Sequence, residues 1–174
     1  NPPAIVVTDS QAVLKVTADV PKNIPVTTFS ILFARQKSDL SAMAIGVASI
    51  GRLKPGDRVL IAEACSHHAL EDDIGRIKIP RWLRQYLGFD VQIDISTGRD
   101  YPENLNQYKL IIHCGACLLT RREMLNRLHK AQERDIPVTN YGVAISFLQG
   151  VIRRTLEPFP YALEAFEKEM KQNS

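Results

Sequence analysis

Two spacings of apolar residues alternate along the chain beyond residue 54. Short apolar runs, or strict alternation of apolar and polar positions, predict strands at residues 59–62, 91–95, 110–112 and 137–139. Apolar residues at helical spacing predict helices at residues 73–87, 120–134, 142–154 and 161–171. Because strands and helices alternate, we expect an α/β fold with a parallel sheet flanked by helices.

Several residues mark where these helices begin and end. Thr120 and Glu123 have the spacing of a capping box, which predicts a helix start. Pro80 is expected near the start of the helix that precedes Gly88, and Gly88 is expected to end that helix.

The first 54 residues follow a different pattern. Strands are predicted at residues 5–7 and 26–33, with a short helix between them that Asp9 or Ser10 caps and that runs through Val20. A second helix is expected after Ser38 or Asp39, although Gly46 weakens it unless packing compensates. Two strands bury too little surface to be stable alone. We therefore expect residues 1–54 to form a small α/β domain that docks on residues 55–174 or pairs with a second copy.

Composition and charge remove several classes of function. The chain has 174 residues and a net charge of +3, with six basic and three acidic residues in 1–54 and sixteen of each in 55–174. No basic run with interleaved aromatic residues is present, so we expect no nucleic-acid partner. No apolar run approaches the roughly 18 residues of a membrane span, so we expect no membrane insertion. The start, Asn1-Pro2-Pro3, has no initiator Met and no signal-peptide core, so we expect a fragment of a longer protein. We also expect a cytoplasmic location.

Cysteine and histidine residues follow two of the predicted strands. Cys65 and His67 come after the strand at 59–62, and His113, Cys114 and Cys117 come after the strand at 110–112. Since the carboxyl ends of parallel strands meet at one edge of a sheet, these side chains are expected to converge. Three cysteines without a secretion signal argue against a disulfide framework.

This donor set suits more than one metal. A Cys-x-x-Cys turn brings two thiolates to one side, and we expect Gly115 to relieve the backbone in that turn. Zinc takes three cysteines and one histidine in structural sites, whereas iron–sulfur clusters are held mainly by thiolates. The cysteines could also be small buried apolar residues, and His113 could be a core residue. The residues alone do not choose between zinc and an iron–sulfur cluster.

The complete pattern resembles a known family. Cys65-x-His67, a spacer of 45 residues and His113-Cys114-x-x-Cys117 resemble the signature of the HydF family, the scaffold GTPases of [FeFe]-hydrogenase maturation. Further stretches that are similar to this family lie at residues 28–35, 56–61 and 140–143. The resemblance extends over nearly the whole chain.

The resemblance implies a domain organisation and a metal centre. Full-length members carry a GTP-binding domain, a dimerisation domain and a cluster-binding domain, and this chain would contain the last two, at residues 1–54 and 55–174. It implies a homodimer formed through residues 1–54. It also implies a [4Fe-4S] cluster on Cys65, Cys114 and Cys117, with His67 or His113 as an exchangeable fourth ligand.

The implied function is assembly and transfer. The scaffold would receive a diiron precursor from two radical-SAM maturases and deliver it to the apo-[FeFe]-hydrogenase. No enzymatic activity is expected of this chain itself, because it has no Walker A motif. The alternative is a zinc-stabilised structural or interaction module that uses the same cysteine and histidine residues.

Overall fold

A computed structural model describes residues 2–64, 73–98 and 100–172. Within these residues, the larger part of the molecule is built on a four-stranded sheet in the order β4-β3-β5-β6. Its strands are β3 (Arg58–Glu63), β4 (Gln92–Thr97), β5 (Tyr108–His113) and β6 (Val138–Asn140). Every neighbouring pair is parallel, which confirms the predicted α/β fold.

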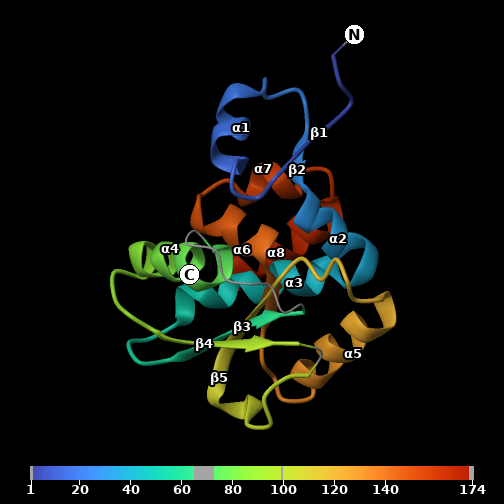
Figure 1. The fold of residues 1–174 in the computed structure, drawn as a ribbon. Helices are drawn as coiled ribbons and strands as arrows, with labels where there is room; N and C mark the ends of the chain where they lie inside the picture. Colours follow the sequence, from blue (N-terminus) through green and yellow to red (C-terminus); the bar gives the residue numbers. More distant parts are fainter. Residues whose placement is uncertain (1, 65–72, 99, 173–174) are drawn as a thin grey trace.

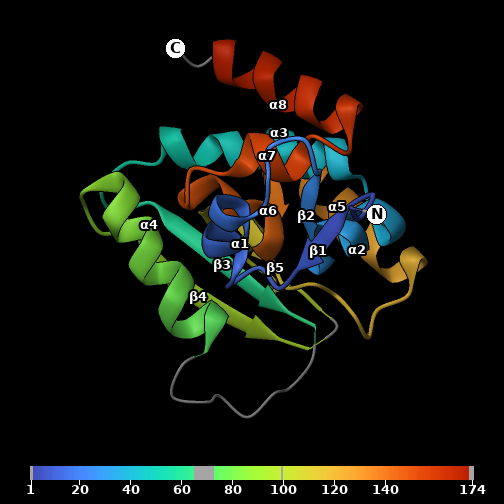
Figure 2. The same ribbon diagram turned by 90° about the horizontal axis from the view of Figure 1, so that it is seen from above.

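Helices cover both faces of this sheet (Figure 1). On one face, the apolar side chains of β3 and β5 pack against helix α5 (Arg121–Gln132). The other face is covered by α3 (Leu40–Ala48), α4 (Ile79–Leu87) and α6 (Tyr141–Leu148). Helix α8 (Pro160–Gln172) forms an outer layer against α3, as Figure 2 shows. The remaining helical segments of this part are 3-10 turns at Ser49–Arg52 and Leu105–Gln107, a π-turn at Ile74–Lys78, and α7 (Ile152–Leu156).

Local signals in the sequence set several of these boundaries. Thr120 and Glu123 form the predicted capping box of α5, and the side chain of Asp39 caps α3 by accepting from the Ala42 N–H. Gly88 ends α4 with a left-handed φ of 76°. Gly46 packs α3 directly on β6, because a Cβ atom there would lie 2.1 Å from the carbonyl oxygen of Val138. Close packing thus compensates for the low helix propensity of this glycine.

Three predicted elements differ in the structure. The strand expected at 26–33 is wrong after Thr28, because the Thr28 side chain caps a helix that begins at Phe29. The helix expected at 142–154 is interrupted at Gly150, whose φ of 74° turns the chain between α6 and α7. The helix through Val20 has Ala12 as its N-cap residue, with no side-chain cap.

The N-terminal segment forms a second, smaller sheet. Strands β1 (Val6–Thr8) and β2 (Val26–Thr28) pair in parallel and flank helix α1 (Val13–Asp19). Helix α2 (Phe29–Lys37) follows and packs against α5 and α6, while β2 packs against α7. The segment is therefore docked on the larger part of the chain. Helix α3 packs on β6 and α8, and the domain boundary at residue 54 stays a prediction.

None of the helices in residues 2–64, 73–98 and 100–172 has the length and apolar character needed to cross a membrane.

Candidate metal centre

The two strands that precede the cysteine motifs end at the same edge of the sheet. Strands β3 and β5 are parallel neighbours, with Ala62 opposite His113 in the register. The Cys114 N–H donates to the Ala62 carbonyl at 2.9 Å, and the Ala64 N–H donates to the Cys114 sulfur at 3.2 Å. Ala64 is the residue directly before Cys65. The backbone that leads into the first motif therefore contacts a thiol of the second.

Part of the expected ligand set lies outside the described residues. Cys65 and His67 fall in the range 65–72, which the structure does not describe. Among the residues that it does describe, no three His, Cys, Asp or Glu side chains come close enough together to hold a metal ion. A complete site formed with Cys65 stays a prediction.

The two cysteines of the second motif have different surroundings. Cys114 is half-buried against the core that α3 and α6 cover, whereas Cys117 is exposed, and both are free thiols. Burial raises the pKa of the Cys114 thiol, and the backbone N–H groups of Ala64 and Ala116 oppose this shift. Because these N–H groups point at the sulfur, they would also stabilise a thiolate there. The donor chemistry fits a thiolate-bound metal or cluster.

A lysine from the N-terminal segment holds the turn between Cys114 and Cys117. Lys37, at the end of α2, donates from Nζ to the carbonyl oxygens of Ala116 at 3.2 Å and Cys117 at 2.8 Å. The left-handed residue of the turn is Ala116, with a φ of 53°, and not Gly115 as expected. A left-handed alanine is strained, so contacts from outside the turn must maintain it. The sequence gives no signal for this contact, since Lys37 is 80 residues from Cys117.

His113 lies on the opposite face of the sheet from Cys114. Along β5, Ile112 belongs to the core under α3 and α6, whereas Ile111 belongs to the core under α5. His113 follows the alternation on the side of Ile111, and Cys114 follows it on the side of Ile112. The structure therefore does not bring the His113 ring and the Cys114 thiol together.

The His113 ring is fully buried and neutral at physiological pH. Burial lowers its pKa to about 4, with a further contribution from the positive charge of Arg127. Its Nδ1 lies 3.0 Å from the Cys114 carbonyl oxygen, and its Nε2 has no hydrogen-bond partner among the described residues. The alternative of a buried core histidine thus agrees with its surroundings.

A polar cluster that the sequence reasoning missed lies at the carboxyl end of β3. The Glu63 carboxylate accepts from the Tyr141 hydroxyl at 3.2 Å and from the Arg76 guanidinium at 3.4 Å. Burial, reinforced by the nearby Glu63 charge, raises the pKa of Tyr141, so its hydroxyl remains protonated and donates. Tyr141 packs against the same core as Cys114. The available signal was a single acidic residue at the end of an apolar strand.

Comparisons with known proteins identify the family. A family model described as the hydrogen maturase F tetramerization domain matches residues 41–158. A second model, described as the hydrogen maturase F dimerization domain, matches residues 1–38. No curated protein matched the chain. Because the first match alone spans more than half of the chain, this protein belongs to the hydrogen maturase F (HydF) family, whose members take part in hydrogenase maturation.

Proposed function

We propose that this chain binds a [4Fe-4S] cluster through Cys65, Cys114 and Cys117. The observation that carries the proposal is the hydrogen bond from the Ala64 N–H to the Cys114 sulfur, which links the residue directly before Cys65 to a thiol of the second motif. Backbone N–H groups directed at sulfur are one of the ways in which proteins stabilise and tune such clusters. Thiolate ligands require reduced cysteines, which agrees with the cytoplasmic location that we propose.

Three cysteine ligands would leave one iron for an exchangeable ligand, which a carrier of metal precursors requires. His67 and His113 are the two candidates from the sequence. The position of His113 on the face opposite Cys114 favours His67. Lys37 would hold the Cys-x-x-Cys turn in shape, and its positive charge would offset part of the negative charge of a thiolate-bound cluster.

The proposed role is that of a scaffold, with the diiron precursor as cargo. The chain would receive this precursor from the two radical-SAM maturases and deliver it to the apo-[FeFe]-hydrogenase. Membership in the HydF family supports this role. We propose assembly and transfer rather than turnover of a substrate, so this chain would not act as an enzyme by itself.

The N-terminal segment would carry the homodimer through residues 1–54. Strand β1 is only half-buried, and within the described part of the chain it pairs with β2 alone. Leu14 and Phe29 of the same segment expose 49% and 56% of their surface. Unpaired strand edges and exposed apolar side chains are natural association surfaces. The family description of a dimerization domain at residues 1–38 supports this assignment.

Anaerobic reconstitution with iron and sulfide tests the cluster. We expect about four irons and four sulfides per chain and an EPR signal after reduction with dithionite. Replacing Cys114 with serine should abolish most of the iron binding. His67→Ala should change the spectrum, whereas His113→Asn should leave it unchanged if His113 stays on the opposite face. His129→Ala is the control, because His129 is exposed and pairs with Glu133.

The same preparation tests the zinc alternative. One zinc per chain that resists exchange, with no paramagnetic signal after reconstitution, would make the site a structural zinc module and contradict the cluster.

Sedimentation velocity tests the dimer. The wild-type chain should sediment as a dimer or a larger assembly at micromolar concentration. Phe29→Ser should shift this equilibrium towards the monomer, because it removes exposed apolar surface from the N-terminal segment. Ile77→Ser is a matched control, since Ile77 is 44% exposed but lies outside residues 1–54. A wild-type monomer at this concentration would contradict the proposal.

A further inference from the structure

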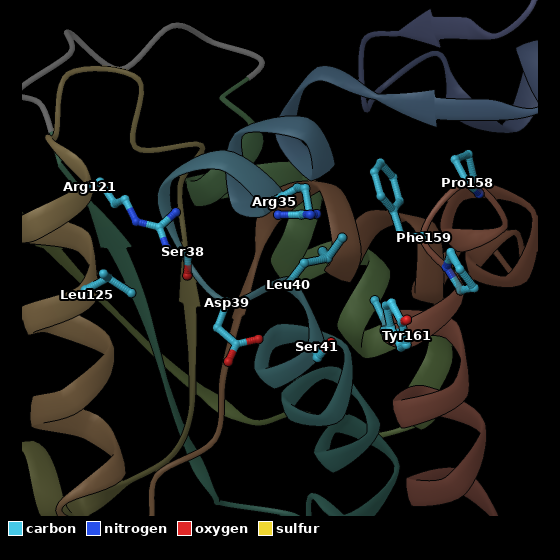
Figure 3. Close-up of a pocket in the computed structure, with 12 residues that line it drawn as sticks. Arg35, Ser38, Asp39, Leu40, Ser41, Arg121, Leu125, Pro158, Phe159 and Tyr161 are labelled. Carbon is cyan, nitrogen blue, oxygen red and sulfur yellow. The ribbon is translucent and has the colours of Figure 1, made fainter.

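A cavity of about 480 Å³ opens where three parts of the chain meet (Figure 3). Its walls come from the junction of α2 and α3, the start of α5, and the connection between α7 and α8. Among the described residues, Cys114, Cys117 and His113 do not line it. Ser38 lines both this cavity and a smaller one beside Cys114, so the two lie next to each other.

Two arginines give the cavity a positive charge. Arg35 and Arg121 both line it, and the Arg35 guanidinium makes no hydrogen bond or ion pair with the described residues. Arg121 donates to the carbonyl of Gln36 at 2.7 Å, which uses one of its five N–H donors. Figure 3 shows both guanidinium groups on the same side of the cavity as Ser38. Paired guanidinium groups are the usual partners of carboxylates and phosphates.

A buried hydroxyl without a partner adds a polar contact. Ser38 lines the cavity, is only 6% exposed, and its Oγ has no hydrogen-bond partner among the described residues. A buried hydroxyl left unpaired costs folding free energy, so a ligand that accepts from it would remove this cost. Ser38 is thus an observation independent of the arginines that points to an oxygen-bearing ligand.

Three helices begin at the cavity, and carboxylates already cap two of them, Asp39 on α3 and Glu123 on α5. Helices α3, α5 and α8 each begin at residues that line the cavity, and each has at least nine residues. Helix N-termini carry partial positive charge and favour anions. The carboxylate in the cavity belongs to Asp39, which accepts from the Ala42 N–H at 3.0 Å as the cap of α3. Two guanidinium groups against one carboxylate leave a net positive site.

The opposite wall of the cavity is apolar and aromatic. It contains Phe159, Tyr161, Pro158 and Pro160, whereas Leu125 lies beside Arg121 on α5. Tyr161 is 83% exposed, which leaves its ring free to be covered by a bound molecule. Aromatic rings and proline surfaces bind flat apolar groups by stacking.

We propose that this cavity binds a small organic anion, in which a phosphate or carboxylate group contacts Arg35, Arg121 and Ser38 and a flat apolar body contacts Phe159 and Tyr161. The site would lie between the match to the dimerization domain and that to the tetramerization domain, since Ser38 ends the first and Ser41 begins the second. Occupation would therefore tie α2 to α5 and α8.

Isothermal titration calorimetry of the cluster-free chain with phenyl phosphate, benzoate and inorganic phosphate tests the proposal. We expect phenyl phosphate or benzoate to bind, and the tighter of the two identifies phosphate or carboxylate as the preferred head group. Inorganic phosphate should bind at least tenfold more weakly, because it lacks the apolar body. Phenol, which has the aromatic ring but is uncharged at pH 7, should not bind.

Substitutions in the cavity assign the binding site. Arg35→Gln and Arg121→Gln should each weaken binding about tenfold, and Ser38→Ala should weaken it severalfold. Arg122→Gln is the matched control, because Arg122 is an exposed neighbour of Arg121 that does not line the cavity. Circular dichroism of each variant verifies folding, and line broadening of the Tyr161 ring resonances in wild-type protein reports binding without any substitution. Equal affinities for all variants, or no binding by either aromatic anion, would overturn the proposal.

Discussion

In the four-stranded sheet, the central strands β3 and β5 are almost wholly buried, and apolar side chains from both of their faces form the two cores of the molecule. In the two-stranded sheet of the N-terminal segment, β1 is half-buried and neither outer edge carries a further strand among the described residues. The larger sheet can be stabilised by burial of its own apolar surface. The smaller sheet needs contacts from outside itself.

Charged and polar side chains supply many of these contacts. Arg154, in α7, donates to the carbonyl oxygens of Pro21 at 2.7 Å, Lys22 at 2.6 Å and Ile24 at 2.7 Å. Asn140, at the end of β6, donates to the Ser30 carbonyl at 2.8 Å. The comparison teaches that apolar packing builds the larger part, whereas the N-terminal segment, whose Val13, Ile31 and Ala34 join the same core, is held in addition by side-chain hydrogen bonds to its backbone carbonyls. Each of the following predictions tests one side of this comparison.

The largest effect is expected from Gly46→Ala, which acts on the apolar packing. The added Cβ would lie 2.1 Å from the Val138 carbonyl oxygen, so α3 must move away from β6. We expect a loss of about 3 kcal/mol in the free energy of unfolding, measured by urea denaturation. Gly51→Ala is the control, because its Cβ would meet only the Tyr86 hydroxyl at 4.0 Å. Equal stability of the two variants would contradict the close packing of α3 on β6.

Arg154→Met tests the hydrogen bonds that hold the N-terminal segment. The Arg154 side chain is mostly buried, and its loss leaves three carbonyl groups without this charged donor. We expect the local stability of β1 and β2 to fall by about 2 kcal/mol, or roughly 30-fold in amide exchange rate. Hydrogen exchange measured by mass spectrometry resolves this change.

The neighbouring arginine provides the control. Arg153 forms an exposed ion pair with Glu167 of α8, so Arg153→Met should leave exchange in β1 and β2 unchanged. If Arg154→Met accelerates amide exchange equally throughout the chain, these hydrogen bonds stabilise the whole fold and not the N-terminal segment in particular. That result would contradict the proposed difference between the two sheets.

The same difference explains how much of the fold the sequence could predict. Apolar periodicity located β3, β5 and α5, because burial of one or both faces determines those patterns. It failed at residues 26–33, where β-branched and aromatic residues suggested a strand. There the hydroxyl of Thr28 caps a helix, and that helix is maintained by packing on α5 and α6, which lie far along the chain, as the separation of 85 residues between Gln36 and Arg121 shows. The helix predicted at 142–154 is interrupted at Gly150, whose positive φ turns the chain. The sequence alone does not show which glycine will adopt a positive φ.

For the candidate site, the sequence could predict the edge of the sheet at which β3 and β5 end. It could not predict the face of the sheet to which each side chain points. Parallel order and strand ends place Cys114 beside the residue that precedes Cys65, as expected. The face of the sheet to which His113 points follows from the alternation of side chains along β5. That alternation can be assigned only when the residues of both cores are known. Lys37 and Tyr141 reach the site from distant segments, and no spacing in the sequence encodes such contacts.

Lys37→Met tests the contact between the N-terminal segment and the Cys-x-x-Cys turn of the candidate metal centre. The variant keeps the length of the side chain and its position near Phe33, but it removes both hydrogen bonds to the Cys-x-x-Cys turn. We expect the cluster-free protein to show severalfold faster alkylation of Cys117. The reconstituted protein should lose iron to a chelator severalfold faster.

Ala116→Gly complements this variant. Glycine adopts the left-handed φ of 53° without strain, so it should restore part of the iron retention when combined with Lys37→Met. Lys109→Met is the control, because Lys109 is an exposed residue of β5. Unchanged alkylation in Lys37→Met would show that the turn keeps its conformation without the N-terminal segment.

The smallest effect is expected from a polar contact of the larger sheet, the pair of Arg58 on β3 and Asp94 on β4. Arg58 donates to the Asp94 carboxylate at 2.5 and 3.2 Å, and this hydrogen bonding lowers the pKa of Asp94 against the opposing effect of burial. Because the pKa is lower in the folded state, the stabilisation is present above the ordinary aspartate pKa of about 3.9 and is lost as the pH falls through the folded value.

Urea midpoints measured between pH 5 and pH 2 should therefore fall with decreasing pH, and Asp94→Asn should remove a small part of that slope. Both partners remain about one-third exposed, so solvent screens the pair and the change at pH 7 should be close to the detection limit. Asp57→Asn is unsuitable as a control because Asp57 accepts from the Lys54 N–H in a turn, whereas the exposed Asp100 is suitable. A large loss of stability in Asp94→Asn at pH 7 would show that polar contacts also hold the larger sheet, and the contrast with the N-terminal segment would then disappear.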